Sequence, residues 1–161
     1  MPEPTAAVLT VSDATARGLR QDLSGPAVKE ALEQHGYRVV ATEIVPDEQP
    51  EIEQAIVRLC ATASLVVTTG GTGLGPRDVT PEATRAVAGR LVEGIPERMR
   101  AEGVRRTPMA ILSRGLCAVR QSSLILNLPG SPKGATESLA MVIEVLPHAL
   151  DLLAGKTAHK P

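Results

Sequence analysis

Short apolar runs alternate with amphipathic segments along this chain. The run at 6–11 is apolar and lacks helical periodicity, which predicts a buried strand. A second strand is expected at 38–45, which is rich in β-branched residues, and a third at 65–69. A further stretch near the C-terminal end, 110–128, is expected to hold at least two more strands. Between the runs, apolar residues recur with the period of an α-helix, most clearly at 52–60. Alternating strands and helices predict an α/β fold of three layers, αβα, with a mostly parallel central sheet.

Residues that favour helix ends set the expected boundaries of the other helices. Ser24 is placed to cap a helix at 24–35, and a weaker helix is expected at 95–104. Thr80-Pro81-Glu82 supplies a capping hydroxyl, a proline and an acidic side chain in the order that favours a helix start. Pro147 is expected to kink or interrupt the last helix, because proline lacks the amide that the preceding turn needs.

Length and composition favour a single domain over residues 1–161, since 43% of the residues are hydrophobic and no repeat or linker divides them. A formal net charge of −1 provides no field that would attract nucleic acid. There is no Phe or Trp, and Tyr37 is the single tyrosine, so bases have no aromatic platform on which to stack. No signal peptide or membrane-spanning segment is recognisable. We therefore expect a cytoplasmic protein without nucleic-acid or membrane partners.

Three polar loops follow predicted strands, and in an open α/β sheet ligands bind where parallel strands end. The loops are at 12–22, 70–80 and 127–134. The middle loop is the strongest candidate, because four glycines between Gly70 and Gly75 let backbone amides approach an anion, and a helix N-terminus follows. The glycine spacing matches neither the P-loop nor the Rossmann motif. The residues leave open an uncommon phosphate site or a plain strand-to-helix turn.

Two aspartates follow predicted strands and point to a cation. Asp78 comes five residues after Gly73, and a carboxylate beside bound phosphates is repelled unless a cation such as Mg²⁺ lies between them. Asp47 occupies a similar place after the second predicted strand. Each also has a structural explanation: Asp78 can stabilise the following helix N-terminus, and Asp47 can serve a turn after Pro46.

Other polar residues of these loops are candidate ligand contacts. Asn127 and Ser131 flank Pro129-Gly130, where side-chain and backbone groups can recognise a heterocycle edge or a phosphate. Lys133 and Ser113 are candidate anion contacts, although Lys133 fits a solvated surface position equally well. No Ser or Cys is paired with a histidine in the manner of an activated nucleophile, so the residues indicate no covalent mechanism.

In combination these motifs resemble the molybdopterin adenylyltransferase family, which comprises MogA/MoaB-type proteins and the corresponding domain of gephyrin. The matching segments read LTVSD (9–13), DLSG (22–25), VPD (45–47), TTGGTG (68–73), PRDVTPEA (76–83), LSR (112–114) and NLPGSPK (127–133). Together they extend over nearly the whole chain. The glycine-rich segment and the PRDVTPEA segment are the most specific of them.

The resemblance implies adenylyl transfer, in which the terminal phosphate of molybdopterin attacks the α-phosphate of Mg-ATP and releases pyrophosphate to give adenylyl-molybdopterin. It implies Asp47 and Asp78 as catalytic and metal-binding residues, with Mg²⁺ as cofactor and ATP as co-substrate. By the same resemblance, nucleotide and phosphate are bound by Gly70, Gly71, Thr72, Gly73, Asn127, Pro129, Gly130 and Ser131, and substrate by Ser12, Asp13, Ser24, Ser113 and Lys133. A homo-oligomer is also implied, with a trimer favoured over a hexamer, as are other molybdenum cofactor biosynthesis proteins as partners.

Two alternative functions compete with the enzyme. A non-catalytic molybdopterin-binding or scaffold protein of the same pathway would keep the pocket and lose turnover, and the presence of both Asp47 and Asp78 in their motifs argues against it. A nucleotide-derivative hydrolase resembling the CinA-type proteins is the other alternative. Those proteins usually carry a second domain, which we do not expect in 161 residues.

Overall fold

A computed structural model describes residues 2–156, and within them six strands form one sheet. The strands are β1 (Thr5–Val11), β2 (Arg38–Val45), β3 (Leu65–Thr69), β4 (Arg90–Leu91), β5 (Cys117–Arg120) and β6 (Ser123–Leu128). They lie in the order β2-β1-β3-β6-β5-β4, in which the first four are parallel and the last two antiparallel to their neighbours. The predicted mostly parallel sheet is confirmed.

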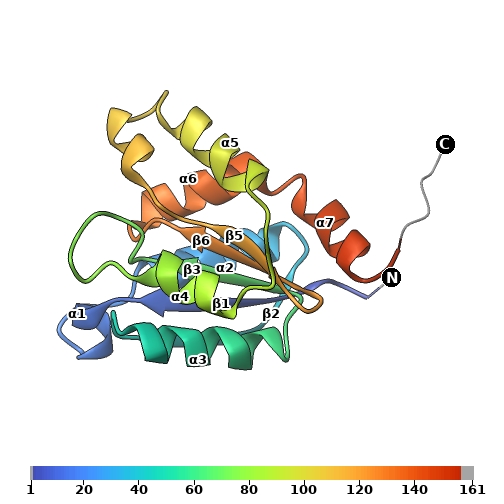
Figure 1. The fold of residues 1–161 in the computed structure, drawn as a ribbon, viewed down its shortest axis with the longest axis horizontal. Coiled ribbons are helices and arrows are strands. Elements are labelled where there is room, and N and C mark those ends of the chain that lie inside the picture. The colour runs from blue at the N-terminus through green and yellow to red at the C-terminus, as the bar shows by residue number, and fades with distance from the viewer. Residues whose placement is uncertain (1, 157–161) are drawn as a thin grey trace.

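Helices cover both faces of this sheet (Figure 1). They are α1 (Asp13–Ala16), α2 (Ser24–Gln34), α3 (Gln49–Cys60), α4 (Thr80–Val87), α5 (Gly94–Gly103), α6 (Pro132–Val142) and α7 (Leu146–Leu153), with a 3₁₀ helix at Pro108–Leu112. α3 packs beside α4 on one face, and α2 packs beside α6 on the other. The predicted αβα arrangement is confirmed. None of the helices in residues 2–156 combines the length and hydrophobicity that crossing a membrane requires.

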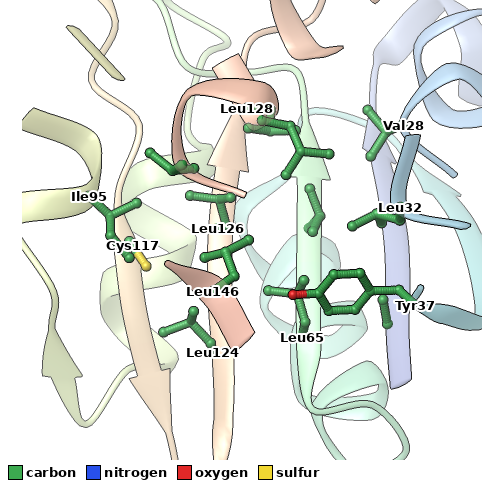
Figure 2. Packing of buried hydrophobic residues seen from close by; sticks show 14 of the residues in the cluster. Val28, Leu32, Tyr37, Leu65, Ile95, Cys117, Leu124, Leu126, Leu128 and Leu146 are labelled. Atoms are coloured by element: carbon green, nitrogen blue, oxygen red, sulfur yellow. The ribbon is translucent and has the colours of Figure 1, made fainter. Parts of the chain in front are cut away.

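Two hydrophobic cores lie on opposite faces of the sheet, which explains why the central strands read as continuous apolar runs. Val8, Val67 and Leu126 belong to the core under α2, α6 and α7, part of which Figure 2 shows. Their neighbours Leu9 and Val66 belong to the core under α3. Successive side chains of a strand point to opposite faces, so a strand buried on both sides needs apolar residues at every position.

Neither of the two hydroxyl residues expected to cap a helix does so. Ser24 is the first residue of α2, whose start is held by Asp22, because an oxygen of Asp22 accepts from the amide of Gly25 at 2.9 Å. Thr80 is the first residue of α4, and its hydroxyl donates to the carbonyl of Gly70 at 2.9 Å instead of capping the helix. The expected interruption at Pro147 is confirmed, since α6 ends before it and α7 begins with it in the first turn.

Tyr37 carries a hydroxyl that finds no partner in the core. Its side chain is 3% exposed, its hydroxyl oxygen accepts or donates no hydrogen bond among the described residues, and burial raises the pKa of the phenol to about 12. Figure 2 shows the ring among the leucines of the first core. We expect Tyr37→Phe to leave the free energy of unfolding unchanged or to raise it by up to about 1 kcal/mol, because an unsatisfied polar group leaves the interior. Urea unfolding measures this.

The matched variant Tyr37→Ala should lose roughly 3 kcal/mol, because it removes the buried ring as well as the hydroxyl. A loss above about 1 kcal/mol in Tyr37→Phe would contradict the prediction and show that the hydroxyl is satisfied in solution.

Candidate active site

Four parallel strands end at one edge of the sheet and bring their loops together. Thr69, the last residue of β3, pairs with Thr10 of β1 on one side and with Leu128 of β6 on the other. β2 ends level with β1, since Val45 pairs with Val11. The loops that follow these strands therefore meet, and Figure 1 shows α1 and the loop between β3 and α4 at this same end of the molecule. This is the edge at which open α/β sheets bind ligands.

The loops surround a cavity of about 480 Å³, a size typical of small-molecule sites. The predicted site residues that line it are Ser12, Ser24, Asp47, Gly70, Gly71, Asp78, Gly130 and Ser131. The predicted residues outside its lining are Asp13, Thr72, Gly73, Ser113, Asn127, Pro129 and Lys133. Each of the three polar loops named from the sequence thus contributes to one cavity.

The glycine loop approaches the rest of the site so closely that side chains are excluded. Gly70 has a φ of +103°, and a β-carbon there would lie 2.2 Å from the carbonyl oxygen of Val11. Gly71 has a φ of +69°, and a β-carbon there would lie 2.3 Å from the hydroxyl of Thr80. The amide of Gly70 donates to the carbonyl of Leu128 at 3.1 Å. It is therefore not available to an anion.

The three amides that follow Gly70 make no hydrogen bond within the described part of the protein. Among residues 2–156, the amides of Gly71, Thr72 and Gly73 have no hydrogen-bond acceptor. Consecutive backbone amides without acceptors form an anion-binding concavity, particularly before a helix N-terminus. Gly71 lines the cavity, so the loop can present at least this donor to a phosphate.

Arg114 holds the glycine loop in this shape. Its guanidinium donates to the carbonyls of Gly73 and Asp78, both at 2.8 Å, and pairs with Glu82 at the start of α4. Its own amide donates to the carbonyl of Thr72 at 2.8 Å. The side chain of Arg114 is thus committed to fixing the loop.

Asp78 contributes both to the loop and to the cavity. Its Oδ2 accepts from the amide of Gly75 at 2.9 Å, and this bond closes the turn that leads into α4. Its Oδ1 has no donor among the described residues. The carboxylate therefore keeps one oxygen for a ligand while the other shapes the loop.

Asp47 is tied to Asp13 by two reciprocal hydrogen bonds. The amide of Asp13 donates to Oδ2 of Asp47 at 2.9 Å, and the amide of Asp47 donates to Oδ1 of Asp13 at 3.0 Å. Arg77 holds the Asp13 side of this pair from outside, since its guanidinium binds Asp13 at 3.0 Å and Glu48 at 2.8 Å. Asp13 therefore supports Asp47 from a position outside the cavity lining.

The two linked carboxyl groups are shifted in opposite directions. The hydrogen bonds from Arg77 come first in holding the pKa of Asp13 below its usual range. Burial is the main cause that raises the pKa of Asp47, and the negative charges of Asp13 and Asp78 raise it further. A cation at the cavity would relieve this concentration of negative charge at Asp47 and Asp78.

The acids fit a cation that is shared with a bound phosphate. Among the described residues, no three His, Cys, Asp or Glu side chains gather as a self-sufficient metal site. Mg²⁺ is often held by one or two carboxylates together with substrate phosphates. Asp47 and Asp78 both line the cavity and supply oxygen ligands of this kind.

Known proteins are similar to this chain in sequence and in fold. Residues 7–148 match the family model described as "Probable molybdopterin binding domain". A molybdopterin adenylyltransferase of Helicobacter pylori is 42% identical over 152 residues, covering 92% of this chain and 86% of the relative. That of Escherichia coli K12 is 40% identical over 164 residues, covering 92% and 84%. The chain belongs to the molybdopterin adenylyltransferase family. A crystal structure of the molybdopterin biosynthesis enzyme MoaB from Thermus thermophilus has 52% identity and a TM-score of 0.89, over 94% of this chain and 96% of that one.

Membership in the molybdopterin adenylyltransferase family confirms the resemblance seen in the motifs, but the structure gives Asn127 a different place from the expected one. Asn127 is 1% exposed, and its amide nitrogen donates to the hydroxyls of Thr68 and Thr84, both at 3.0 Å. Its Oδ1 accepts from the amide of Leu116 at 3.0 Å. Both polar atoms of its side chain are engaged within the protein, so the side chain joins β6 to β3 and α4, and a contact of Asn127 with nucleotide or phosphate stays a prediction.

Ser113 and Lys133, which were predicted to contact substrate, line other cavities than the main one. Ser113 lines a small cavity of about 50 Å³ together with Arg100, which donates to the carbonyl of Ser113 at 3.4 Å. Lys133 is exposed and lines a groove of about 450 Å³ that adjoins the main cavity through Ser131. Their contact with substrate stays a prediction.

The sequence reasoning missed several residues of the 12–22 loop and of the strand before it. Asp22 lines the cavity, and its two oxygens accept from the hydroxyl of Thr10 at 2.8 Å and from the amide of Gly25 at 2.9 Å. Arg20 and Gln21 line it too. The DLSG segment contained a signal for Asp22, since an aspartate three residues before a glycine at a helix start can hold that helix end.

Proposed function

We propose that this chain transfers the adenylyl group of ATP to the terminal phosphate of molybdopterin. An oxygen of that phosphate forms a bond to the α-phosphorus of ATP, and the bond from this phosphorus to the oxygen bridging to the β-phosphate breaks. The electron pair of the broken bond leaves with pyrophosphate. The other product is adenylyl-molybdopterin.

One observation carries the proposal: a single cavity joins Gly71, whose amide is unused, to Asp47 and Asp78. The attacking phosphate is already an anion, so the reaction needs no side-chain nucleophile or base. It needs positioning and neutralisation of charge, which amide donors and a cation site provide. The names of the two relatives, both adenylyltransferases, support turnover over a binding-only role.

Mg²⁺ is the cation that this chemistry calls for, and it would supply positive charge to the phosphates of ATP. Asp47 and Asp78 would hold it. The structure supports a division of labour in which Gly71 donates to a phosphate oxygen while Arg114 and Asp78 keep the loop in place.

We further propose that the protein is a cytoplasmic homo-oligomer, with a trimer favoured over a hexamer, and that it works with other proteins of molybdenum cofactor biosynthesis. Met109 and Ile111 on the 3₁₀ helix are 65% and 67% exposed and offer an apolar surface for subunit contact. A cytoplasmic location would give the enzyme its ATP.

Turnover of the purified full chain tests the proposed function. With molybdopterin, ATP and Mg²⁺ we expect release of pyrophosphate and one equivalent of adenylyl-molybdopterin, identified by its mass. Removal of Mg²⁺ with a chelator should stop both, because the phosphate charges are then not neutralised.

The adenylyltransferase of Escherichia coli serves as the positive control in the same reaction. Binding of molybdopterin without pyrophosphate, while the control enzyme turns over, would replace the proposal by the scaffold function. Unchanged turnover in the presence of the chelator would show that the reaction does not need Mg²⁺.

A further inference from the structure

The main cavity is acidic for a site that receives phosphate-bearing ligands. Its lining includes the three aspartates Asp22, Asp47 and Asp78. Among the described lining residues, Arg20 is the single basic side chain. The carboxylates repel phosphate groups that enter this cavity unless cationic groups offset their charge. A positively charged side chain in the lining would reduce this repulsion.

Two other arginines near the cavity are committed elsewhere. Arg77 binds Asp13 and Glu48 through three hydrogen bonds. Arg114 is used by the glycine loop and Glu82. Neither side chain is part of the cavity lining.

Arg20 differs from these arginines in having no partner. Within residues 2–156 its guanidinium takes part in none of the ion pairs, which all use other lysines and arginines. The residue is exposed and lines the cavity, and its guanidinium carries five N–H donors that can bind an acceptor.

The backbone that presents Arg20 is nevertheless fixed. Two residues further on, Asp22 binds the hydroxyl of Thr10 in β1 and the amide of Gly25 in α2, at 2.8 and 2.9 Å. Gly25 allows this, because a β-carbon there would lie 2.3 Å from Oδ2 of Asp22. An unpaired guanidinium is thus carried on an anchored segment beside the phosphate-binding loop.

We propose that Arg20 is a substrate-binding residue that recognises a phosphate group of ATP or of molybdopterin. The inference rests on the proposed function only for the identity of these two ligands. A guanidinium binds phosphate oxygens through paired, charge-assisted hydrogen bonds, which suits a cavity where amide donors and Mg²⁺ must share several phosphates. Asp22 is the positioning residue for Arg20, since both of its carboxylate oxygens are used to hold the segment.

Equilibrium binding to the full chain tests this assignment without requiring turnover. Calorimetric titrations of wild type and Arg20→Gln with ATP, with molybdopterin and with adenosine separate the phosphate contact from contacts to the ring. We expect Arg20→Gln to weaken ATP or molybdopterin binding at least about tenfold and to leave adenosine binding unchanged. The ligand that loses affinity identifies the phosphate that Arg20 contacts, and high salt should narrow the difference.

Arg17→Gln is the matched control, because it removes the same charge from the same segment at a residue that does not line the cavity. Arg20→Lys should recover part of the lost affinity. The inference is overturned if both phosphate ligands bind Arg20→Gln and Arg17→Gln equally well, if adenosine loses affinity as much as ATP does, or if wild type binds neither phosphate ligand. A wild type that binds ATP through Arg20 yet releases no pyrophosphate would overturn the proposed function and leave this assignment standing.

Discussion

Replacing Asp78 with asparagine is expected to lower the rate of pyrophosphate release by roughly 10²-fold or more. The amide oxygen of asparagine can still accept from the amide of Gly75, a bond of 2.9 Å that closes the loop. The substitution therefore removes the negative charge at the cavity and keeps the turn. The measurement is the rate of adenylyl transfer with saturating Mg²⁺, combined with the melting temperature, which should stay within about 2 °C of wild type.

Two further variants separate charge from loop shape. Asp78→Ala also loses the bond to Gly75, so it should lose both rate and stability, the latter by roughly 1 kcal/mol or more. Glu51→Gln removes an exposed charge on α3, away from the cavity lining, and should retain wild-type activity. If Asp78→Asn retains more than about half of the wild-type rate, Asp78 has only the structural role that the sequence had left open.

The strands β2 and β3 could be predicted because each is a continuous run of aliphatic or β-branched residues, although only the central strand β3 is buried throughout and β2 lies at the edge of the sheet. β2 and β3 lie where the apolar runs place them, residue for residue. The helix starts were less predictable, since a hydroxyl beside a helix has more than one acceptor or donor to choose from. Thr80 reaches across to the carbonyl of Gly70, a residue ten positions away whose proximity depends on how β3 enters the loop. Local propensity contains no information on such a contact.

The position of the candidate site was predictable in outline, because the loops that follow parallel strands meet at one edge of the sheet. The exchange of hydrogen bonds between Asp13 and Asp47, however, joins residues 34 positions apart and follows from the pairing of β1 with β2. Asn127 was expected to face a ligand because it belongs to a polar loop motif. It is the next-to-last residue of β6, and its side chain points into the polar contacts behind the loop. A motif thus identifies a functional region, while the register decides which of its side chains reach the cavity.

The arginines of the site depend on folding in the same way. Three of them come from motif segments or adjoin one, and their uses cannot be told from the sequence. Arg77 is bound to two carboxylates, Arg114 to the loop, and Arg20 to nothing within residues 2–156. The difference lies in which acceptors surround each guanidinium after folding. Arg77 and Arg114, which are paired within the protein, hold the site in shape. Arg20, which is unpaired within residues 2–156, remains available to bind a ligand.

Gly70→Ala is expected to destabilise the protein by roughly 3 kcal/mol or more and to lower the melting temperature by about 6–12 °C. Two costs add at this residue. A φ of +103° disfavours a side chain, and the new β-carbon would lie 2.2 Å from the carbonyl oxygen of Val11, so the end of β1 or the loop must move. Adenylyl transfer should fall as well, since this movement displaces the edge at which the loops meet.

Gly18→Ala separates the two costs, because Gly18 has a φ of +74° but nothing within 4 Å of the position that a β-carbon would take. It should lose only about 1 kcal/mol, the conformational part alone. Thermal unfolding of both variants, followed by circular dichroism, gives the comparison. Equal losses would show that the close approach of Gly70 to Val11 relaxes at little cost, and the glycine at this position would then be explained by backbone conformation alone. A larger loss in Gly70→Ala, with the difference exceeding about 1 kcal/mol, means that the loop and β1 are packed as one unit, so that the amides proposed to bind phosphate are positioned by the sheet itself.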